Sequence, residues 1–165
     1  MDHAYFGRVE TSALDGPDVV WESTSRLGGD EVEVQLWAGP SSELDAEELD
    51  AFAACLTGLS ALDTAARTAL RTCLHEDRYF IDHHVEELED SETVVRLVRD
   101  AADEAVGADA FAAAMCLSSV GLWLSDLSDG PPVILDYIFD PDLSDQILAV
   151  KLTRDGTVVS VDRES

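Results

Sequence analysis

Basic residues are scarce in this sequence. Its 165 residues include 10 lysines and arginines against 35 aspartates and glutamates, a formal net charge of −25. A nucleic-acid-binding protein gains much of its affinity when cationic side chains release counterions from the phosphates. We therefore expect no nucleic-acid partner.

Long apolar runs and a recognisable leader are also missing. The first ten residues, MDHAYFGRVE, carry acids and an early glycine where a signal peptide has a basic start and an apolar core. No apolar run has the length of a membrane span. We expect a soluble cytoplasmic protein that does not associate with a membrane.

Cysteine is rare. Cys55, Cys73 and Cys116 are far apart, odd in number and without a C-x-x-C pair, which excludes a zinc or redox motif of that kind. We expect buried, reduced thiols.

The sequence also lacks G-x-S-x-G, a glycine-rich phosphate loop and a P-loop. No catalytic residue and no cofactor is assigned, and an enzyme is the less favoured interpretation.

Hydrophobic residues make up 46% of the chain, enough for a core in one domain spanning 1–165. The stretches AYFGRVET, VVWESTSRL and DEVEVQLWAG alternate polar with β-branched or aromatic residues, which predicts strands over about 4–38. Gly28-Gly29-Asp30 is typical of a hairpin between the last two.

The middle of the chain, about 43–106, has helical periodicity. Helices are predicted over ELDAEELDAFAACLTGL, from about Ala61, through HEDRYFIDHH, and over SETVVRLVRDAADEAV, with Gly107 at its end. Strands return over about 116–162, and Asp155-Gly156 indicates a hairpin before the last one. This order predicts an α+β fold, an antiparallel sheet with the central helical block packed on one side.

The stretch HEDRYFIDHH holds three of the four histidines. His83 and His84 point about 100° apart on a helix, and the four-residue spacing of a zinc helix is absent. The favoured interpretation is a packed His84 beside a solvated His83. A metal site formed by Asp82, His83 and His84 is the alternative.

Two further features carry polar or aromatic groups. FDPDLSD (139–145) resembles the start of a calcium loop, but Asp145 and Lys151 occupy the positions that need glycine and glutamate, so we expect a polar connection between strands. Asp136 interrupts an apolar strand and needs either a partner or internal hydrogen bonds. The three tryptophans (21, 37 and 123) are more often sheet packing than ligand platforms.

The acids are unevenly distributed. No lysine or arginine occurs from Leu27 to Ala66 or from Asp100 to Val150. If these two acidic windows meet in the fold, they form a negative face that steers a basic partner; general solubility or a salt-rich habitat is the alternative explanation. The predicted partner-binding residues are Glu43, Asp45, Glu47, Glu48, Asp50, Asp136, Asp140, Asp142 and Asp145.

The C-terminal third also carries a family resemblance. VILDYIFDPDLSDQILAVKLTRDGTVVSVDRES, with LDY, SDxxLAV, DG and a terminal ES, together with Phe6-Gly7, resembles a bacterial family catalogued as a domain of unknown function. The resemblance is strongest from Pro132 to Ser165. It implies a small acidic cytoplasmic α+β protein, of a general kind similar to immunity proteins of toxin systems, and it supplies no catalytic residue.

Three hypotheses follow. The first is a non-catalytic binding module for a basic protein, in its sharpest form an immunity protein against a nuclease-type toxin. The second is a metal-dependent hydrolase that uses Asp82, His83, His84 and Asp136. The third is a structural domain that forms a homodimer by pairing edge strands such as GTVVSVD.

Overall fold

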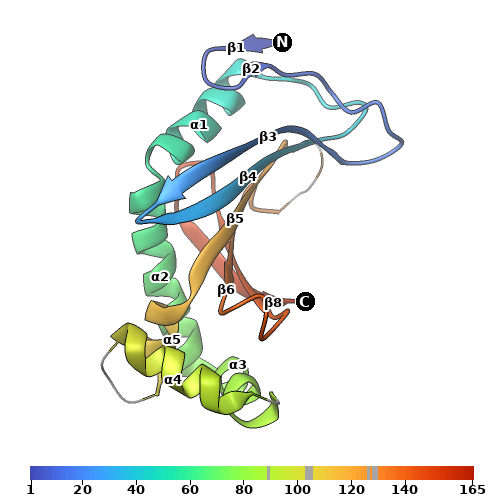
Figure 1. The fold of residues 1–165 in the computed structure, drawn as a ribbon. Helices are drawn as coiled ribbons and strands as arrows, with labels where there is room; N and C mark the ends of the chain where they lie inside the picture. Colours follow the sequence, from blue (N-terminus) through green and yellow to red (C-terminus); the bar gives the residue numbers. More distant parts are fainter. Residues whose placement is uncertain (89, 103–105, 126, 128–129) are drawn as a thin grey trace.

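The protein is built around a six-stranded sheet whose strands lie in sequence order. The computed structural model describes residues 1–88, 90–102, 106–125, 127 and 130–165. The strand order is β3-β4-β5-β6-β7-β8, and Figure 1 shows the sheet with all of these strands labelled except β7. The strands are β3 (Asp18–Leu27), β4 (Asp30–Ala38), β5 (Cys116–Trp123), β6 (Val133–Ile138), β7 (Ile147–Leu152) and β8 (Val158–Glu164).

The helical block lies between β4 and β5 in the sequence. Its members are α1 (Ala46–Thr57), α2 (Leu59–Glu76), α3 (Tyr79–Asp82), a π-helical turn η1 (His83–Glu87), α4 (Ser91–Ala102) and α5 (Ala108–Ala114). In Figure 1, α1 and α2 run along one side of the sheet and α3 to α5 gather at one end. The α+β class predicted from the sequence is confirmed.

Both predicted hairpins are present, and each turns at a glycine. Gly28 joins β3 to β4 with a φ of 68°, and Gly156 precedes β8 with a φ of 83°. Side chains with a Cβ rarely adopt such positive angles, which explains the choice of glycine.

The N-terminal prediction was wrong in its extent. The stretch AYFGRVET does not form one strand; β1 (Asp2–His3) pairs with β2 (Gly7–Arg8) in a separate two-stranded sheet. Gly7 has a φ of 68°, which turns the chain where a continuous strand would run straight.

One strand pair departs from the antiparallel prediction. β4 and β5 are parallel, in a register that runs from Glu33 opposite Ser119 to Trp37 opposite Trp123. The physical reason is the long helical connection between the two strands, since a crossover through helices lets the chain re-enter the sheet in the same direction. The other pairs of the sheet are antiparallel.

The core lies between the helices and one face of the sheet. Asp45 fixes the start of α1 because its carboxylate accepts hydrogen bonds from the amides of Glu47 (3.4 Å) and Glu48 (3.3 Å). The fully buried side chains include Leu49, Phe52, Leu70 and Leu74 from the helices and Leu36, Leu122, Leu135, Tyr137 and Val150 from the strands. Burial of these apolar side chains is the main source of stability.

The opposite face of the sheet is only half-buried. In β6, Val133, Leu135 and Tyr137 are buried, whereas the alternating Ile134 and Asp136 are partly exposed. Successive strand residues point to opposite faces, so Ile134 and Asp136 lie on the side away from α1 and α2. We call this side of the six-stranded sheet, marked by Ile134, Asp136 and Ile138 of β6, the open face.

Candidate functional site

Carboxylates from several strands gather on the open face. One row of cross-strand neighbours contains Thr24, Glu33, Ser119, Asp136, Ala149 and Asp162. The adjacent row contains Glu22, Gln35, Gly121, Ile134, Lys151 and Ser160. The open face therefore combines acidic, apolar and small residues from β3 to β8.

The two acidic windows meet here in part. Glu33, from the first window, and Asp136, from the second, stand on either side of Ser119 in the sheet. The Ser119 hydroxyl donates a hydrogen bond to the Asp136 carboxylate at 2.7 Å. Burial raises the pKa of Asp136, and this hydrogen bond opposes the rise. The predicted internal hydrogen bond to Asp136 is thus present.

A second meeting point surrounds Cys116, at the start of β5. Partial desolvation raises the pKa of the Cys116 thiol, and the negative charges of Asp30 and Asp140 raise it further. Asp30 belongs to the first window and Asp140 to the second. Cys116 is exposed, which corrects the prediction of buried thiols; Cys55 is buried and Cys73 is partly buried, and all three are free.

Two of the predicted partner-binding acids are structural. The Glu48 side chain is 4% exposed and receives hydrogen bonds from Arg154 at 2.6 Å and from the Ser125 amide at 3.0 Å. It links α1 to the β7–β8 turn. Asp45 is the N-cap of α1. The Glu48 carboxylate is used inside the fold and does not belong to an exposed acidic surface, whereas Asp45 caps the helix and stays exposed.

The remaining predicted acids lie outside the open face. Glu43, Glu47 and Asp50 are exposed beside or on α1, and Asp50 contacts His3 at 3.1 Å. Asp142 and Asp145 are exposed in the connection between β6 and β7. The Asp142 amide donates to the Asp140 carboxylate at 2.9 Å, which confirms the predicted polar turn.

The predicted packing of His84 is confirmed, whereas His83, predicted to be solvated, is only partly exposed and stacks on Tyr79. His84 is completely buried among aromatic rings, with centroid distances of 4.3 Å to Phe80, 6.1 Å to Phe111 and 5.7 Å to Phe139. Its Nδ1 lies 2.7 Å from the carbonyl oxygen of Phe80, which only accepts, so Nδ1 carries the proton. Burial lowers the pKa of His84. His83 is partly exposed.

The hydrolase constellation is not assembled. His84 packs against Phe139 on the helix side, whereas Asp136 points to the open face, so the sheet separates them. Asp82 contacts Arg78 at 3.4 Å. Within residues 1–88, 90–102, 106–125, 127 and 130–165, no group of three or more histidine, cysteine or acidic side chains is arranged to hold a metal ion.

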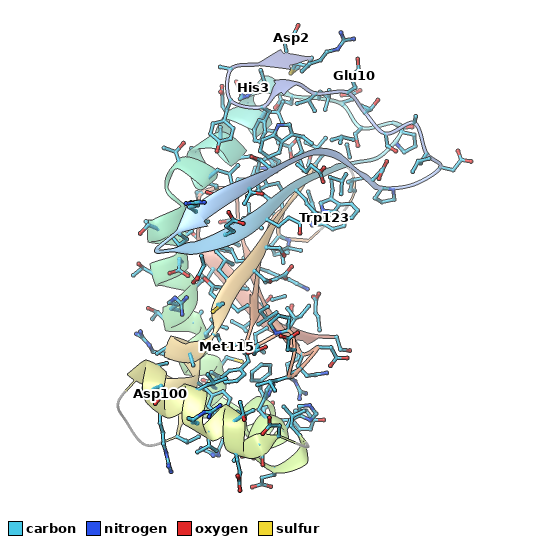
Figure 2. The ribbon with its side chains drawn as sticks, viewed as in Figure 1. Asp2, His3, Glu10, Asp100, Met115 and Trp123 are labelled. Carbon is cyan, nitrogen blue, oxygen red and sulfur yellow. The ribbon has the colours of Figure 1, made fainter. Side chains whose placement is uncertain are left out.

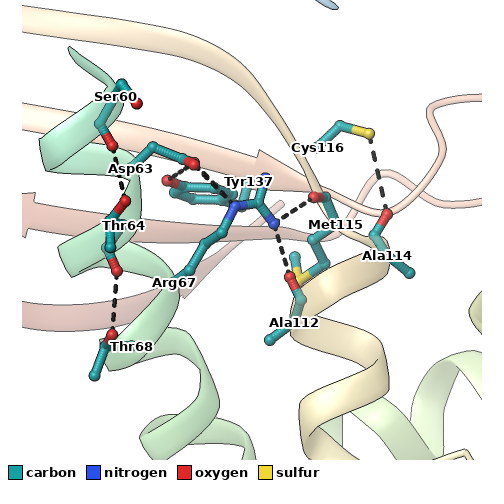
Figure 3. A network of polar contacts seen from close by, with 10 residues as sticks. All are labelled: Ser60, Asp63, Thr64, Arg67, Thr68, Ala112, Ala114, Met115, Cys116 and Tyr137. Atoms are coloured by element: carbon teal, nitrogen blue, oxygen red, sulfur yellow. Dashed lines mark hydrogen bonds and ion pairs between the residues drawn. The ribbon is translucent and has the colours of Figure 1, made fainter. Parts of the chain in front are cut away.

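A partly buried polar network joins α2 to β6 and to the end of α5, and the sequence did not reveal it (Figure 3). The Tyr137 hydroxyl donates to Asp63 at 2.8 Å, and Arg67 Nε donates to the same carboxylate at 3.0 Å. Arg67 also donates to the carbonyl oxygens of Ala112 (2.8 Å) and Met115 (3.0 Å). Burial and then Asp63 raise the pKa of Tyr137. The partners satisfy one another, so this network is structural.

The three tryptophans lie on different faces of the six-stranded sheet. Trp37 and Trp123 stack on the open face, with ring centroids 4.9 Å apart and planes 2° from parallel. Figure 2 labels Trp123 on the side of the sheet away from α1 and α2. Trp21 pairs in register with the buried Leu36 and packs edge-on against Phe6 at 4.8 Å. The sequence could not reveal the stack, because it depends on the parallel pairing of β4 with β5.

Comparison with known proteins does not add an identification. No family model, no curated protein and no solved structure matches the chain. The family resemblance of the C-terminal third therefore stays a prediction.

No single helix in the described part is long and apolar enough to cross a membrane. Taken together, α1 and α2 have the length and composition of a membrane span, but the pair is bent by 76°.

Proposed function

We propose that this protein is a non-catalytic binding module that captures a basic protein partner on the open face. The observation that carries the proposal is a sheet face on which no helix of the described residues lies and on which carboxylates from both acidic windows come together, as Glu33 and Asp136 do beside Ser119. A negative surface of this kind raises the on-rate of a positively charged partner.

The few basic side chains of the open face are already paired. Lys151 lies 3.0 Å from Asp162 and 3.1 Å from Glu164, and Arg26 lies 3.3 Å from Glu31. In the part of the chain that the structure describes, Glu22 and Glu33 have no ion-pair partner. The Glu33 carboxylate accepts a hydrogen bond from the Gln35 side-chain amide at 2.7 Å, but no cation among the described residues neutralises either acid, so both charges are available to a partner.

The sharpest form of the proposal is an immunity protein that acts in the cytoplasm against a nuclease-type toxin. A nuclease must present a basic cleft to the phosphate backbone, and an acidic protein face can occupy that cleft. The family resemblance of the C-terminal third supports this form, and the net charge of −25 agrees with it.

The test compares two variants that each lose two charges. Glu22→Gln/Glu33→Gln alters the open face, and Glu43→Gln/Glu47→Gln removes the same charge beside and on α1. Proteins from a lysate of the source cell are captured on each immobilised variant at low salt and eluted by a salt step. The proposal predicts one stoichiometric basic protein on the wild type and on the α1 variant, with much less on the open-face variant.

The kinetics of the isolated pair provide the second readout. We expect the open-face variant to reduce the on-rate and to flatten its dependence on salt, because long-range attraction is screened by ions. An unchanged salt dependence, or equal loss in both variants, would show that the open face is not the docking surface.

A homodimer through β8 is the second candidate function. β8 is the last strand of the sheet, and the Val159 side chain on it is 54% exposed. Two such edges can pair by backbone hydrogen bonds. Light scattering at increasing concentration tests this, with Val159→Lys as the variant: a dimer that Val159→Lys disrupts supports it, and a monomer at all concentrations rules it out.

A further inference from the structure

Trp37 and Trp123, stacked ring against ring, form the aromatic platform of the open face. The Trp123 ring folds back over Gly121, where an added Cβ would lie only 3.0 Å from the indole Nε1. Glycine at 121 therefore leaves room for this ring position. Trp37 stacks on Trp123 across the parallel strand pair, so the two rings lie together at the C-terminal ends of β4 and β5, and the Trp123 ring extends back toward Gly121.

A polar hollow of about 630 Å³ lies between β3, β4 and β5. It is lined by Glu22, Ser23, Thr24, Glu31, Glu33 and Ser118. Glu22 is the cross-strand neighbour of Gln35, which precedes Trp37 by two residues on the same face. The end of the hollow at Glu22 therefore lies toward the aromatic platform, and the hollow extends away from it toward Glu31.

The combination of carboxylates and stacked indoles favours arginine over lysine. Both lysine and arginine are attracted to the carboxylates of the hollow, but only the planar guanidinium of arginine can stack on an indole and donate paired hydrogen bonds to a carboxylate. Of the three acids in the hollow, Glu31 already contacts Arg26, at 3.3 Å. Glu22 and Glu33 are the exposed acids that remain for a partner's guanidinium.

We propose that the hollow of the open face receives an arginine side chain of the basic partner, which stacks on the Trp37–Trp123 pair and hydrogen-bonds to Glu22 and Glu33. This inference rests on the proposed function, and it adds the chemistry of the anchor. Charge brings the partner to the face, and the arginine fixes its position there. A partner segment that offers only lysine satisfies the charge but not the aromatic platform.

The experiment uses two labelled nonapeptides of equal charge, one alternating arginine with glycine and the other alternating lysine with glycine. Fluorescence anisotropy at low salt measures their affinity for the full chain. We expect the arginine peptide to bind about three- to fivefold more tightly than the lysine peptide. Trp123→Leu should abolish this preference and leave the affinity for the lysine peptide unchanged.

A second variant tests the hollow without altering the aromatic pair. Thr24 is exposed and is the cross-strand neighbour of Glu33, so Thr24→Arg places a guanidinium in the hollow with little risk to folding. Thr68→Arg, at an exposed position on α2, is the matched control with the same change of charge. We expect Thr24→Arg to weaken binding of the arginine peptide about tenfold and Thr68→Arg to weaken it less than twofold.

The outcomes separate the two proposals. Equal affinity for both peptides, with no effect of Trp123→Leu, would overturn the arginine site; if Glu22→Gln/Glu33→Gln still weakened both peptides, the proposed function would stand. Binding of neither peptide at low salt would overturn the proposed function as well. Equal weakening by Thr24→Arg and Thr68→Arg would likewise count against the hollow as the place where arginine binds.

Discussion

The two faces of the six-stranded sheet use their polar groups in opposite ways. On the helix side, Asp63, Arg67 and Tyr137 satisfy one another inside the protein, and Glu48 is paired with Arg154. On the open face, Glu22 and Glu33 are exposed beside a stacked aromatic pair. Buried polar groups without partners are costly, whereas exposed ones are free to meet a ligand.

This difference assigns stability and binding to different residues. Substitutions on the helix side should change the free energy of unfolding and leave the affinity of the folded protein intact. Substitutions of the exposed acids Glu22 and Glu33 on the open face should do the reverse, whereas Asp136, which is partly buried, affects stability as well. The substitutions that follow test whether stability depends mainly on the helix side, beginning with the largest expected effect on the free energy of unfolding.

Arg154→Ala should destabilise the protein by about 2–3 kcal/mol, because it leaves the buried Glu48 carboxylate without its cation. Urea unfolding followed by circular dichroism measures the change. The matched control is Arg8→Ala, which removes an exposed pair with Glu10 and should change stability by less than about 0.5 kcal/mol. Equal effects of the two substitutions would refute the structural role of Glu48.

Tyr137→Phe should cost about 1–2 kcal/mol, since Asp63 loses a hydrogen-bond donor in a partly buried network. Tyr5→Phe, at an exposed tyrosine, serves as the control and should leave the unfolding midpoint in place. Equal free energies of unfolding for Tyr137→Phe and Tyr5→Phe would contradict the stabilising role of the Tyr137–Asp63 hydrogen bond.

His84→Leu should remove part of the acid sensitivity of the fold. Burial holds the pKa of His84 below its ordinary value of 6.5, so the unfolded chain takes up the proton first and stability falls as pH drops below about 6.5. Unfolding free energies between pH 7.5 and 5 should fall less steeply for His84→Leu than for the wild type.

Asp136→Asn should stabilise the protein slightly at neutral pH, by about 0.5 kcal/mol. The pKa of Asp136 is raised by burial, so its ionised form is disfavoured in the folded state above that pKa. The gain should shrink as pH falls through the raised pKa and vanish below the ordinary value of 3.8, where the wild-type carboxyl is protonated in both states. A gain independent of pH would contradict the assigned cause.

Local patterns in the sequence predicted a large part of this fold. The hairpins at Gly28 and Gly156, the succession of strands and helices, and the burial of His84 follow from turn chemistry and from periodicity. These features depend on residues close together in the chain. They can therefore be deduced without knowledge of which strands are neighbours.

The candidate site could be predicted only in part, because it depends on distant pairings. Nothing local indicates that Trp37 lies opposite Trp123, since the parallel pairing of β4 and β5 bridges the whole helical block. The role of Glu48 on α1 also could not be assigned from the sequence, because its partner is distant in the chain. Glu48 follows Glu47 in an acidic run, yet it pairs with Arg154, which is 106 residues further along the chain.

The most direct test uses the three tryptophans as reporters of the two faces. The indole N–H resonances of Trp21, Trp37 and Trp123 are assigned by single substitutions and followed by NMR during titration with the arginine–glycine peptide. The account predicts that the Trp37 and Trp123 resonances shift while that of Trp21, packed against Phe6 on the helix side, stays in place. A shift of Trp21 alone, or binding without any indole shift, would contradict the assignment of binding to the open face.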